Sequence, residues 1–272
     1  MEFGPIIAKT RLYNFHSHTQ FCDGHATMEE MARAAVACGM EHYGFSPHSP
    51  IPIASPCNMS SESVGEFLGE VERLQQLPEL AACRFYKAME IDFLGDDYGP
   101  ANDYFKNLGL DYSIGSIHFI PTQSGEYVDI DGSFENFSKR MKLYFRNDIE
   151  YVVSTFFSQS AKMIEHGGFD ILGHFDKVGQ NASYYSPGIE DSELYRSLVN
   201  GLIDTIIARR LTIELNTKAR ELHGRFFPGE RYLERLVRAG ITILVNSDAH
   251  RPDRINASRD EAYRILDSLK DA

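Results

Sequence analysis

The sequence has few cysteines, four among 272 residues, at positions 22, 38, 57 and 83. No two of them form a C-x-x-C pair, and thiols this scattered in a chain of this length are typical of a reduced protein, not of a disulfide framework. We therefore expect four free thiols, each acting as a small buried hydrophobic side chain.

Long hydrophobic runs are also missing. No apolar stretch approaches the ~20 residues needed to cross a bilayer, and the opening residues MEFGPIIAKTRL lack the basic and apolar regions of a signal peptide. The sequence therefore predicts a soluble, cytoplasmic protein with no membrane partner.

Positive charge is in the minority, with 27 Lys and Arg against 39 Asp and Glu and a formal net charge of −12. Such a chain lacks the basic surface that follows a nucleic-acid backbone, so long nucleic acids are not expected partners. Metal ions and a few cationic side chains could still reverse the field locally and hold a small phosphate ester.

The hydrophobic residues, 43% of the chain, suffice for a substantial core, and no linker, repeat or low-complexity tract divides residues 1–272. We predict one α/β domain in which β-rich runs alternate with helical stretches, as in a parallel sheet or barrel. The predicted strands are Leu12–Phe15, His42–Ser46, Arg84–Ile91, Tyr112–Ile117, Asp170–Gly173, Leu211–Leu215 and Ile241–Asn246.

The predicted helices lie between most of these strands. Thr27 and Glu30 have the spacing of a capping box, and Gly39 marks the end of that helix. Further helices are expected from about Ser61, Asn147, Ser192, Glu230 and Asn256. The segment Pro121–Arg146 fits this alternation least well and is predicted to be an insertion over one face, helical in part.

Almost every predicted strand ends in a residue able to bind a metal ion. The candidates are His16 and His18, His48, Glu90, His118, His174, and Asp248 with His250. Because the carboxyl ends of the strands of a parallel barrel converge on one mouth, residues distant in sequence can meet there. A histidine on its own, such as His42 or His166, indicates no more than a structural role.

Histidine and carboxylate ligands together suit zinc, manganese or iron, and a carboxylate can bridge two ions. Glu90 is therefore the expected bridge. Residues two apart in a strand share a face, and this spacing occurs in both His16–His18 and Asp248–His250. Asp23 and His25 compete for one further position after the first strand; Asp23 is favoured as ligand, and His25 would then face the substrate.

These residues carry a resemblance to the polymerase-and-histidinol-phosphatase (PHP) superfamily. HSHTQFCDG resembles its first motif, SPHSP its second, Glu90 its third and NSDAH its last, while GSIHF and DILGHF supply two further matches. ELNTKARELHGRFFP, at 214–228, is similar to a segment of PHP-type histidinol-phosphatases.

The resemblance implies a single-domain, distorted (β/α)7 TIM-like barrel that binds two or three divalent cations. It also implies a set of metal ligands, namely His16, His18, Asp23, His48, Glu90, His118, His174, Asp248 and His250. SPH stands here in place of the more usual TDH, so the second motif lacks an acid beside His48.

The expected activity is metal-dependent hydrolysis of a phosphomonoester. The resemblance to PHP-type histidinol-phosphatases implies L-histidinol phosphate as the substrate. Three divalent ions bring about +6 and three carboxylates return about −3, which leaves a pocket that attracts phosphate. A metal-bridging hydroxide held at Glu90 and Asp248 would attack phosphorus, with no covalent enzyme intermediate.

Arg220 and Arg225, with Lys218 and Lys177 behind them, are candidates for gripping the phosphate; solvated loop charges are the alternative. Two other functions remain open. One is hydrolysis of another small phosphate ester, such as a nucleotide or sugar phosphate, and the other is a non-catalytic, metal-binding regulatory role.

Overall fold

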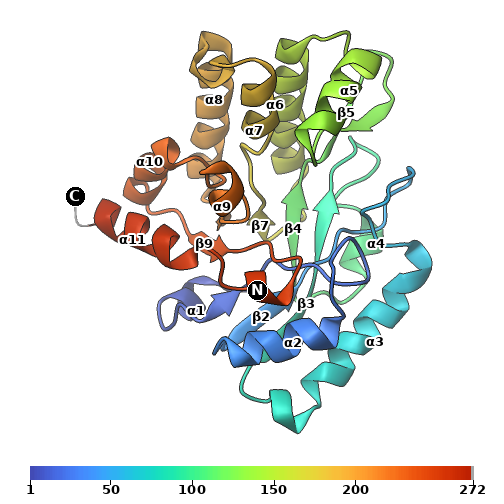
Figure 1. Ribbon diagram of the computed structural model, residues 1–272, viewed down its shortest axis with the longest axis vertical. Coiled ribbons are helices and arrows are strands. Elements are labelled where there is room, and N and C mark those ends of the chain that lie inside the picture. The colour runs from blue at the N-terminus through green and yellow to red at the C-terminus, as the bar shows by residue number, and fades with distance from the viewer. Residues whose placement is uncertain (271–272) are drawn as a thin grey trace.

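The computed structural model describes residues 1–270, and seven parallel strands form its central sheet (Figure 1). In spatial order they are β1 (Tyr13–Asn14), β2 (His42–Phe45), β3 (Arg84–Asp92), β4 (Tyr112–Ser116), β7 (Ile171–Leu172), β8 (Ile213–Asn216) and β9 (Ile243–Asn246). A parallel bridge between Ser17 and Ala249 joins the segments just beyond the two outer strands and nearly closes the barrel. The predicted seven-stranded barrel is confirmed, and each predicted strand overlaps an observed one.

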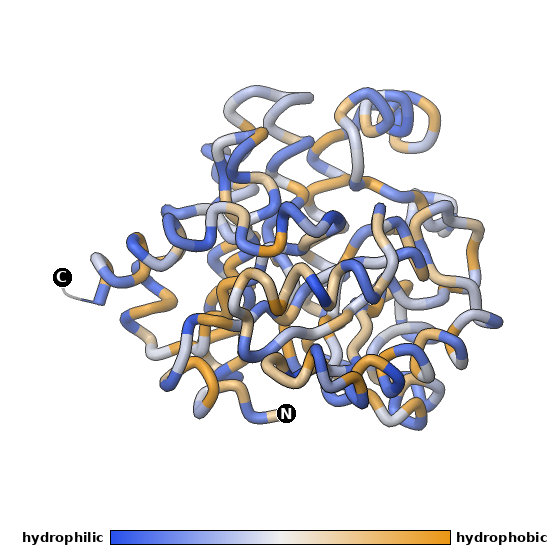
Figure 2. The backbone as a smooth tube through the Cα atoms, turned by 60° about the horizontal axis from the view of Figure 1, so that its bottom comes forward, coloured by the Kyte–Doolittle hydropathy of each residue, from blue (hydrophilic) through white to orange (hydrophobic). Residues whose placement is uncertain are grey.

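Helices surround the barrel where the sequence predicted them. They are α2 (Met28–Ala37), α3 (Val64–Gln75), α6 (Ile149–His166), α8 (Glu193–Arg209), α10 (Leu233–Arg238) and α11 (Arg259–Lys270). The capping box at the start of α2 is complete: the Glu30 amide donates to Thr27 Oγ1 and the Glu30 carboxylate accepts from the Thr27 amide. Hydrophobic and hydrophilic residues alternate along these outer helices (Figure 2), which leaves one face of each for the core.

Several elements were not predicted, namely the helices α1 (Gly4–Ile7), α4 (Asp103–Lys106), α7 (Val178–Tyr185) and α9 (Arg220–His223), and the 3-10 turns η2 (Pro78–Leu80), η3 (Ile189–Asp191) and η5 (Pro252–Arg254). The 3-10 turns η1 (Ser61–Ser63) and η4 (Glu230–Tyr232) lie at the starts of the helices predicted from about Ser61 and Glu230. Within residues 1–270, no helix combines the length and the hydrophobicity that a membrane crossing requires.

The segment Pro121–Arg146 contains one expected and one unexpected element. Helix α5 (Phe134–Tyr144) is the helical part that the sequence predicted. The antiparallel hairpin of β5 (Phe119–Pro121) and β6 (Tyr127–Asp129) was missed. This hairpin starts directly after β4 and packs, with α5, near α6 and α7 (Figure 1). It therefore rises from the carboxyl end of the sheet.

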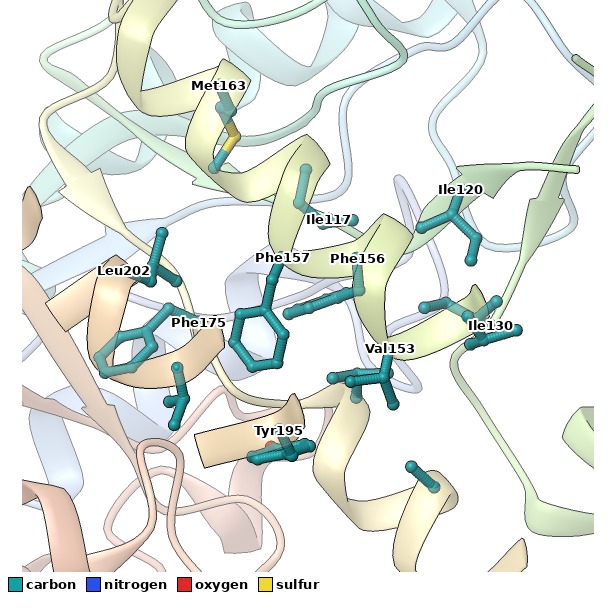
Figure 3. Packing of buried hydrophobic residues seen from close by; sticks show 14 of the residues in the cluster. Ile117, Ile120, Ile130, Val153, Phe156, Phe157, Met163, Phe175, Tyr195 and Leu202 are labelled. Carbon is teal, nitrogen blue, oxygen red and sulfur yellow. The ribbon is translucent and has the colours of Figure 1, made fainter. Parts of the chain in front are cut away.

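Aromatic side chains fill the interior of the barrel. One buried cluster draws on five of the strands and includes Tyr13, Tyr86 and Tyr112, with Phe3 of the N-terminal segment packed against them. A second cluster lies outside the sheet, where Phe156 and Phe157 of α6 pack toward Tyr195 of α8 (Figure 3). Because apolar side chains occupy the body of the barrel, its buried ionisable side chains collect at the carboxyl ends of the strands.

Candidate metal centre

Glu90, the last residue but two of β3, lies at the middle of the histidine cluster. Its side chain is buried, and each of its two oxygens faces a different set of imidazole nitrogens. Oε2 lies 3.0 Å from His48 Nδ1, 3.2 Å from His16 Nε2 and 3.5 Å from His18 Nε2. Oε1 lies 2.8 Å from His174 Nε2 and 3.4 Å from His118 Nε2. This arrangement is the one expected of a carboxylate that bridges two ions.

Asp248 and Asp23 extend the cluster toward the surface. Asp248 Oδ1 lies 3.1 Å from His18 Nε2 and 3.8 Å from His16 Nε2. Asp23 Oδ1 lies 3.3 Å from His250 Nε2, 3.6 Å from His18 Nδ1 and 3.7 Å from His48 Nε2. His25, the competitor of Asp23 in the sequence, belongs to none of the candidate ligand groups found within residues 1–270.

The side chains form three overlapping groups whose ligand atoms lie within 4.8 Å of one another: His18–Asp23–His48–His250, His16–His18–Asp248 and His48–Glu90–His118. Several of their atoms are buried and have no hydrogen-bond partner in the described part of the chain, namely His16 Nε2, His18 Nε2, His118 Nε2 and Asp23 Oδ1. A buried polar atom without a partner costs free energy. Imidazole nitrogens and carboxylate oxygens that lie this close together are the ligands that divalent cations such as zinc bind.

The pKa values of the cluster show how strongly its charges interact. Burial alone would raise the pKa of Glu90, but His16, His118 and His48 hold it well below its usual range. Burial alone would lower the pKa of His16, but Glu214, Asp248 and Glu90 raise it well above its usual range. The buried carboxylates therefore remain ionised and require nearby positive charge.

Two carboxylates that the sequence interpretation missed orient the ligands. Glu214 Oε2 lies 2.8 Å from His16 Nδ1, and Asp92 Oδ1 lies 2.8 Å from His118 Nδ1. Both are fully buried. A carboxylate on one ring nitrogen directs the other nitrogen toward a metal. Asp92 follows Glu90 at the same two-residue spacing that revealed the His16–His18 pair, so that signal was present in the sequence.

Lys218 is a cation that contacts the cluster directly. Its Nζ lies 3.3 Å from Asp248 Oδ1 and 3.2 Å from His250 Nε2. Its side chain borders two cavities, one of about 320 Å³ that also contacts His25 and Asp248, and one of about 140 Å³ that also contacts Asp23 and His118. Lys177 is instead paired with Asp131, with 2.7 Å between Nζ and Oδ2.

The two arginines proposed from the sequence to bind phosphate are paired with acidic side chains outside the cluster. Arg220 Nε donates to Glu261 Oε2 at 3.0 Å and Nη1 to Glu230 Oε1 at 2.9 Å. Arg225 Nη1 donates to Glu190 Oε1 at 3.0 Å. Neither arginine lines the cavities beside the cluster. The structure thus does not bring these guanidinium groups to the cluster, because acidic side chains of other segments bind them.

The PHP domain family model matches residues 14–218. This chain belongs to the PHP domain family. The matched range contains all the candidate ligands except Asp248 and His250, which the three-dimensional arrangement places beside them, as the sequence predicted. Among curated proteins, none matches the sequence.

Two solved structures are similar to this PHP domain. A candidate histidinol phosphatase, HisK, from Listeria monocytogenes matches with a TM-score of 0.79 at 19% sequence identity, over 92% of this chain and 99% of its own. Histidinol phosphate phosphatase (HisK) from Lactococcus lactis, in a structure with zinc, L-histidinol and phosphate, matches with a TM-score of 0.70 at 18% identity, over 94% of this chain and 93% of its own. At these identities the similarity establishes the fold.

Proposed function

We propose that this PHP domain protein is a metal-dependent phosphomonoesterase that hydrolyses L-histidinol phosphate to L-histidinol and phosphate. The observation that carries the proposal is the shared carboxylate of Glu90, with histidine nitrogens at both of its oxygens. The Lactococcus lactis relative, whose structure holds zinc, L-histidinol and phosphate, supports the choice of substrate.

The residues that would hold two or three divalent cations, zinc, manganese or iron, are the nine named from the sequence, with Asp23 preferred to His25. Bound cations supply Lewis acidity, which activates water and offsets the charge of the phosphate. Glu90 and Asp248 are carboxylates whose oxygens lie within 3.8 Å of histidines from more than one of the three groups, His16 and His48 for Glu90 and His16 and His250 for Asp248. Glu214 and Asp92 keep the rings of His16 and His118 in the required orientation.

Lys218 adds the positive charge that the chain itself directs at the substrate. Its ammonium lies beside Asp248, and its side chain lines both cavities, so that it can hydrogen-bond a phosphate oxygen. In the reaction, a P–O bond to water forms, the P–O bond to the alcohol breaks, and the alcohol oxygen leaves with a proton. No side chain has to form a covalent bond to phosphorus.

Phosphate release by the zinc- or manganese-loaded protein tests the proposal. L-Histidinol phosphate, a nucleoside monophosphate and a sugar phosphate are offered at equal concentration, with Glu90→Gln as the inactive control. We expect the highest kcat/KM for L-histidinol phosphate. Preference for another ester would change the proposed substrate but retain the proposed phosphoesterase activity. If fully metallated protein released phosphate from none of the esters, a metal-binding role without catalysis would be favoured.

The cytoplasmic location and the lack of affinity for long nucleic acids, both expected from the sequence, stay predictions.

A further inference from the structure

A cavity of about 140 Å³ adjoins the candidate metal centre on the side of the β5–β6 hairpin. Its lining includes Asp23, His48 and His118 of the cluster, and Asp129 and Asp131 from the end of the hairpin. His118 is 4% exposed, and its Nε2 has no hydrogen-bond partner within residues 1–270. The charged and metal-binding groups around the cavity are therefore the candidate ligands, Lys218, and two carboxylates that do not belong to the candidate ligands.

The hairpin end is held in position by a hydrogen bond within itself and by hydrogen bonds to two other segments. The Asp131 amide donates to Asp129 Oδ1 at 2.7 Å, and the Ile130 amide donates to the carbonyl of His118 at 2.9 Å. Asn181 Nδ2, on α7, donates to the Gly132 carbonyl at 3.3 Å. A segment held in this way keeps its geometry before a ligand arrives, which limits the entropy lost on binding.

The charge on this wall of the cavity is negative. Arg140 reaches Asp129 Oδ2 at 2.8 Å and Lys177 reaches Asp131 Oδ2 at 2.7 Å, but neither cation lines the cavity. Burial would raise the pKa of Asp131, but Lys177 lowers it, so that the carboxylate remains ionised at neutral pH.

The size of the cavity limits what can enter it. Its volume of about 140 Å³ is several times the ~30 Å³ that one water occupies, yet below the ~300 Å³ at which pockets for larger ligands begin. A small amine or an imidazole fits this volume, whereas a nucleoside requires more.

We propose that Asp131, supported by Asp129, binds the positively charged alcohol portion of the substrate and so makes the enzyme selective for phosphate esters of cationic amino alcohols. The inference rests on the proposed function, because it assigns the leaving group of that reaction to the hairpin cavity. The phosphate then lies over the cluster, and the ammonium or imidazolium points toward Asp131 Oδ1.

The selectivity would arise because the Asp131 carboxylate gains a hydrogen bond from a cationic alcohol and gains none from a neutral alcohol. A cationic alcohol replaces the water around Asp131 with a charge-assisted hydrogen bond, which is worth about 1.5–3 kcal/mol. A neutral alcohol displaces that water but carries no cationic donor to replace its hydrogen bonds to the carboxylate. The energy range corresponds to a preference of about 10- to 100-fold.

The test compares Asp131→Asn and Asp129→Asn with wild type on L-histidinol phosphate and on phenyl phosphate, whose leaving group carries no cation. Both substitutions keep the size of the side chain and an amide oxygen for the Lys177 or Arg140 contact. Asp103→Asn, at an exposed aspartate of α4, is the matched control. We expect Asp131→Asn to lower kcat/KM for L-histidinol phosphate at least 10-fold, mainly through KM, with a change below 3-fold on phenyl phosphate.

Equal losses on both esters, or no loss on L-histidinol phosphate, would overturn the assignment. Metal content and circular dichroism identify a misfolded variant, and Asp131→Glu, which keeps the charge, should then retain the preference. Titration of L-histidinol alone into the zinc-loaded protein separates this inference from the reaction itself. If L-histidinol binds and Asp131→Asn weakens that binding, the subsite is supported even without turnover. If the protein hydrolyses phenyl phosphate and shows no preference for the cationic ester, the phosphatase activity is established and the subsite is contradicted.

Discussion

Glu214 Oε2 lies 2.8 Å from Nδ1 of His16, and the two side chains come from β8 and from the segment after β1, 198 residues apart in the chain. The other oxygen of Glu214 accepts the amide of His174 at 3.0 Å. One buried carboxylate therefore determines the orientation of one candidate ligand and the backbone position of another.

Glu214→Gln should weaken metal binding by about 10- to 100-fold, the usual effect of losing a carboxylate that orients a histidine ligand. Competition of the zinc-loaded protein with a chromogenic chelator measures the change. Glu193→Gln, at an exposed position of α8, is the control. If both variants bind zinc as wild type does, Glu214 serves packing alone.

Removal of the metal ions should abolish phosphate release and also lower the melting temperature. Without cations, Asp23, Glu90 and Asp248 face one another as charged carboxylates in a largely buried site. A ligand at 100 times its Kd stabilises the folded state by about 2.7 kcal/mol, so a shift of several degrees is expected. Differential scanning calorimetry before and after EDTA, and after zinc is restored, checks this. An unchanged melting temperature would argue against cations at this cluster.

Lys218→Met should affect substrate binding, whereas Arg220→Met should affect stability. We expect Lys218→Met to raise KM for the phosphate ester several-fold, because the Lys218 ammonium borders both cavities at the cluster. Arg220→Met should leave KM unchanged and lower the urea midpoint, because this guanidinium joins α9 to Glu261 of α11. A rise in KM for Arg220→Met alone would restore the role predicted from the sequence.

Arg259→Met should destabilise the protein by about 2–4 kcal/mol. Arg259 is 2% exposed and donates to the carbonyls of Tyr13, Arg11 and Val245, which joins α11 to the first and last strands of the barrel. Removal of the guanidinium takes a donor from each of these carbonyls, two of which, those of Tyr13 and Val245, belong to buried residues. Urea denaturation measures the loss, with Arg264→Met, at an exposed position on the same helix, as the control. A loss below 1 kcal/mol would contradict this role.

His42 should make the fold less stable in mild acid. Its Nδ1 shares a hydrogen bond of 2.7 Å with the Tyr86 hydroxyl, and burial lowers the pKa of His42 below its usual value. As the pH falls below about 6.5, the unfolded chain binds a proton before the folded one does, so stability is lost as the pH drops through the folded pKa. The urea midpoint of wild type relative to His42→Gln should therefore decrease between pH 8 and pH 5. An increase would mean that the shift has the opposite sign.

Local patterns in the chain were enough to predict the barrel strands, the capping box of α2 and the concentration of ligands at the strand ends. These features depend on side-chain periods of two and 3.6 and on residues three or four apart. The same patterns could not show the β5–β6 hairpin, because its strands are three residues long and have too few positions for a clear alternation.

The sequence by itself determined that histidines and carboxylates would gather at one end of a parallel barrel, since each follows a strand and parallel strands end on one side. Tertiary structure alone decided the partners of those groups. Arg220 could have met a phosphate or Glu261, and Asp131 could have faced solvent or the cavity beside His118. An ion pair depends on distances between segments far apart in the chain, and the packing of helices and hairpins around the barrel sets those distances.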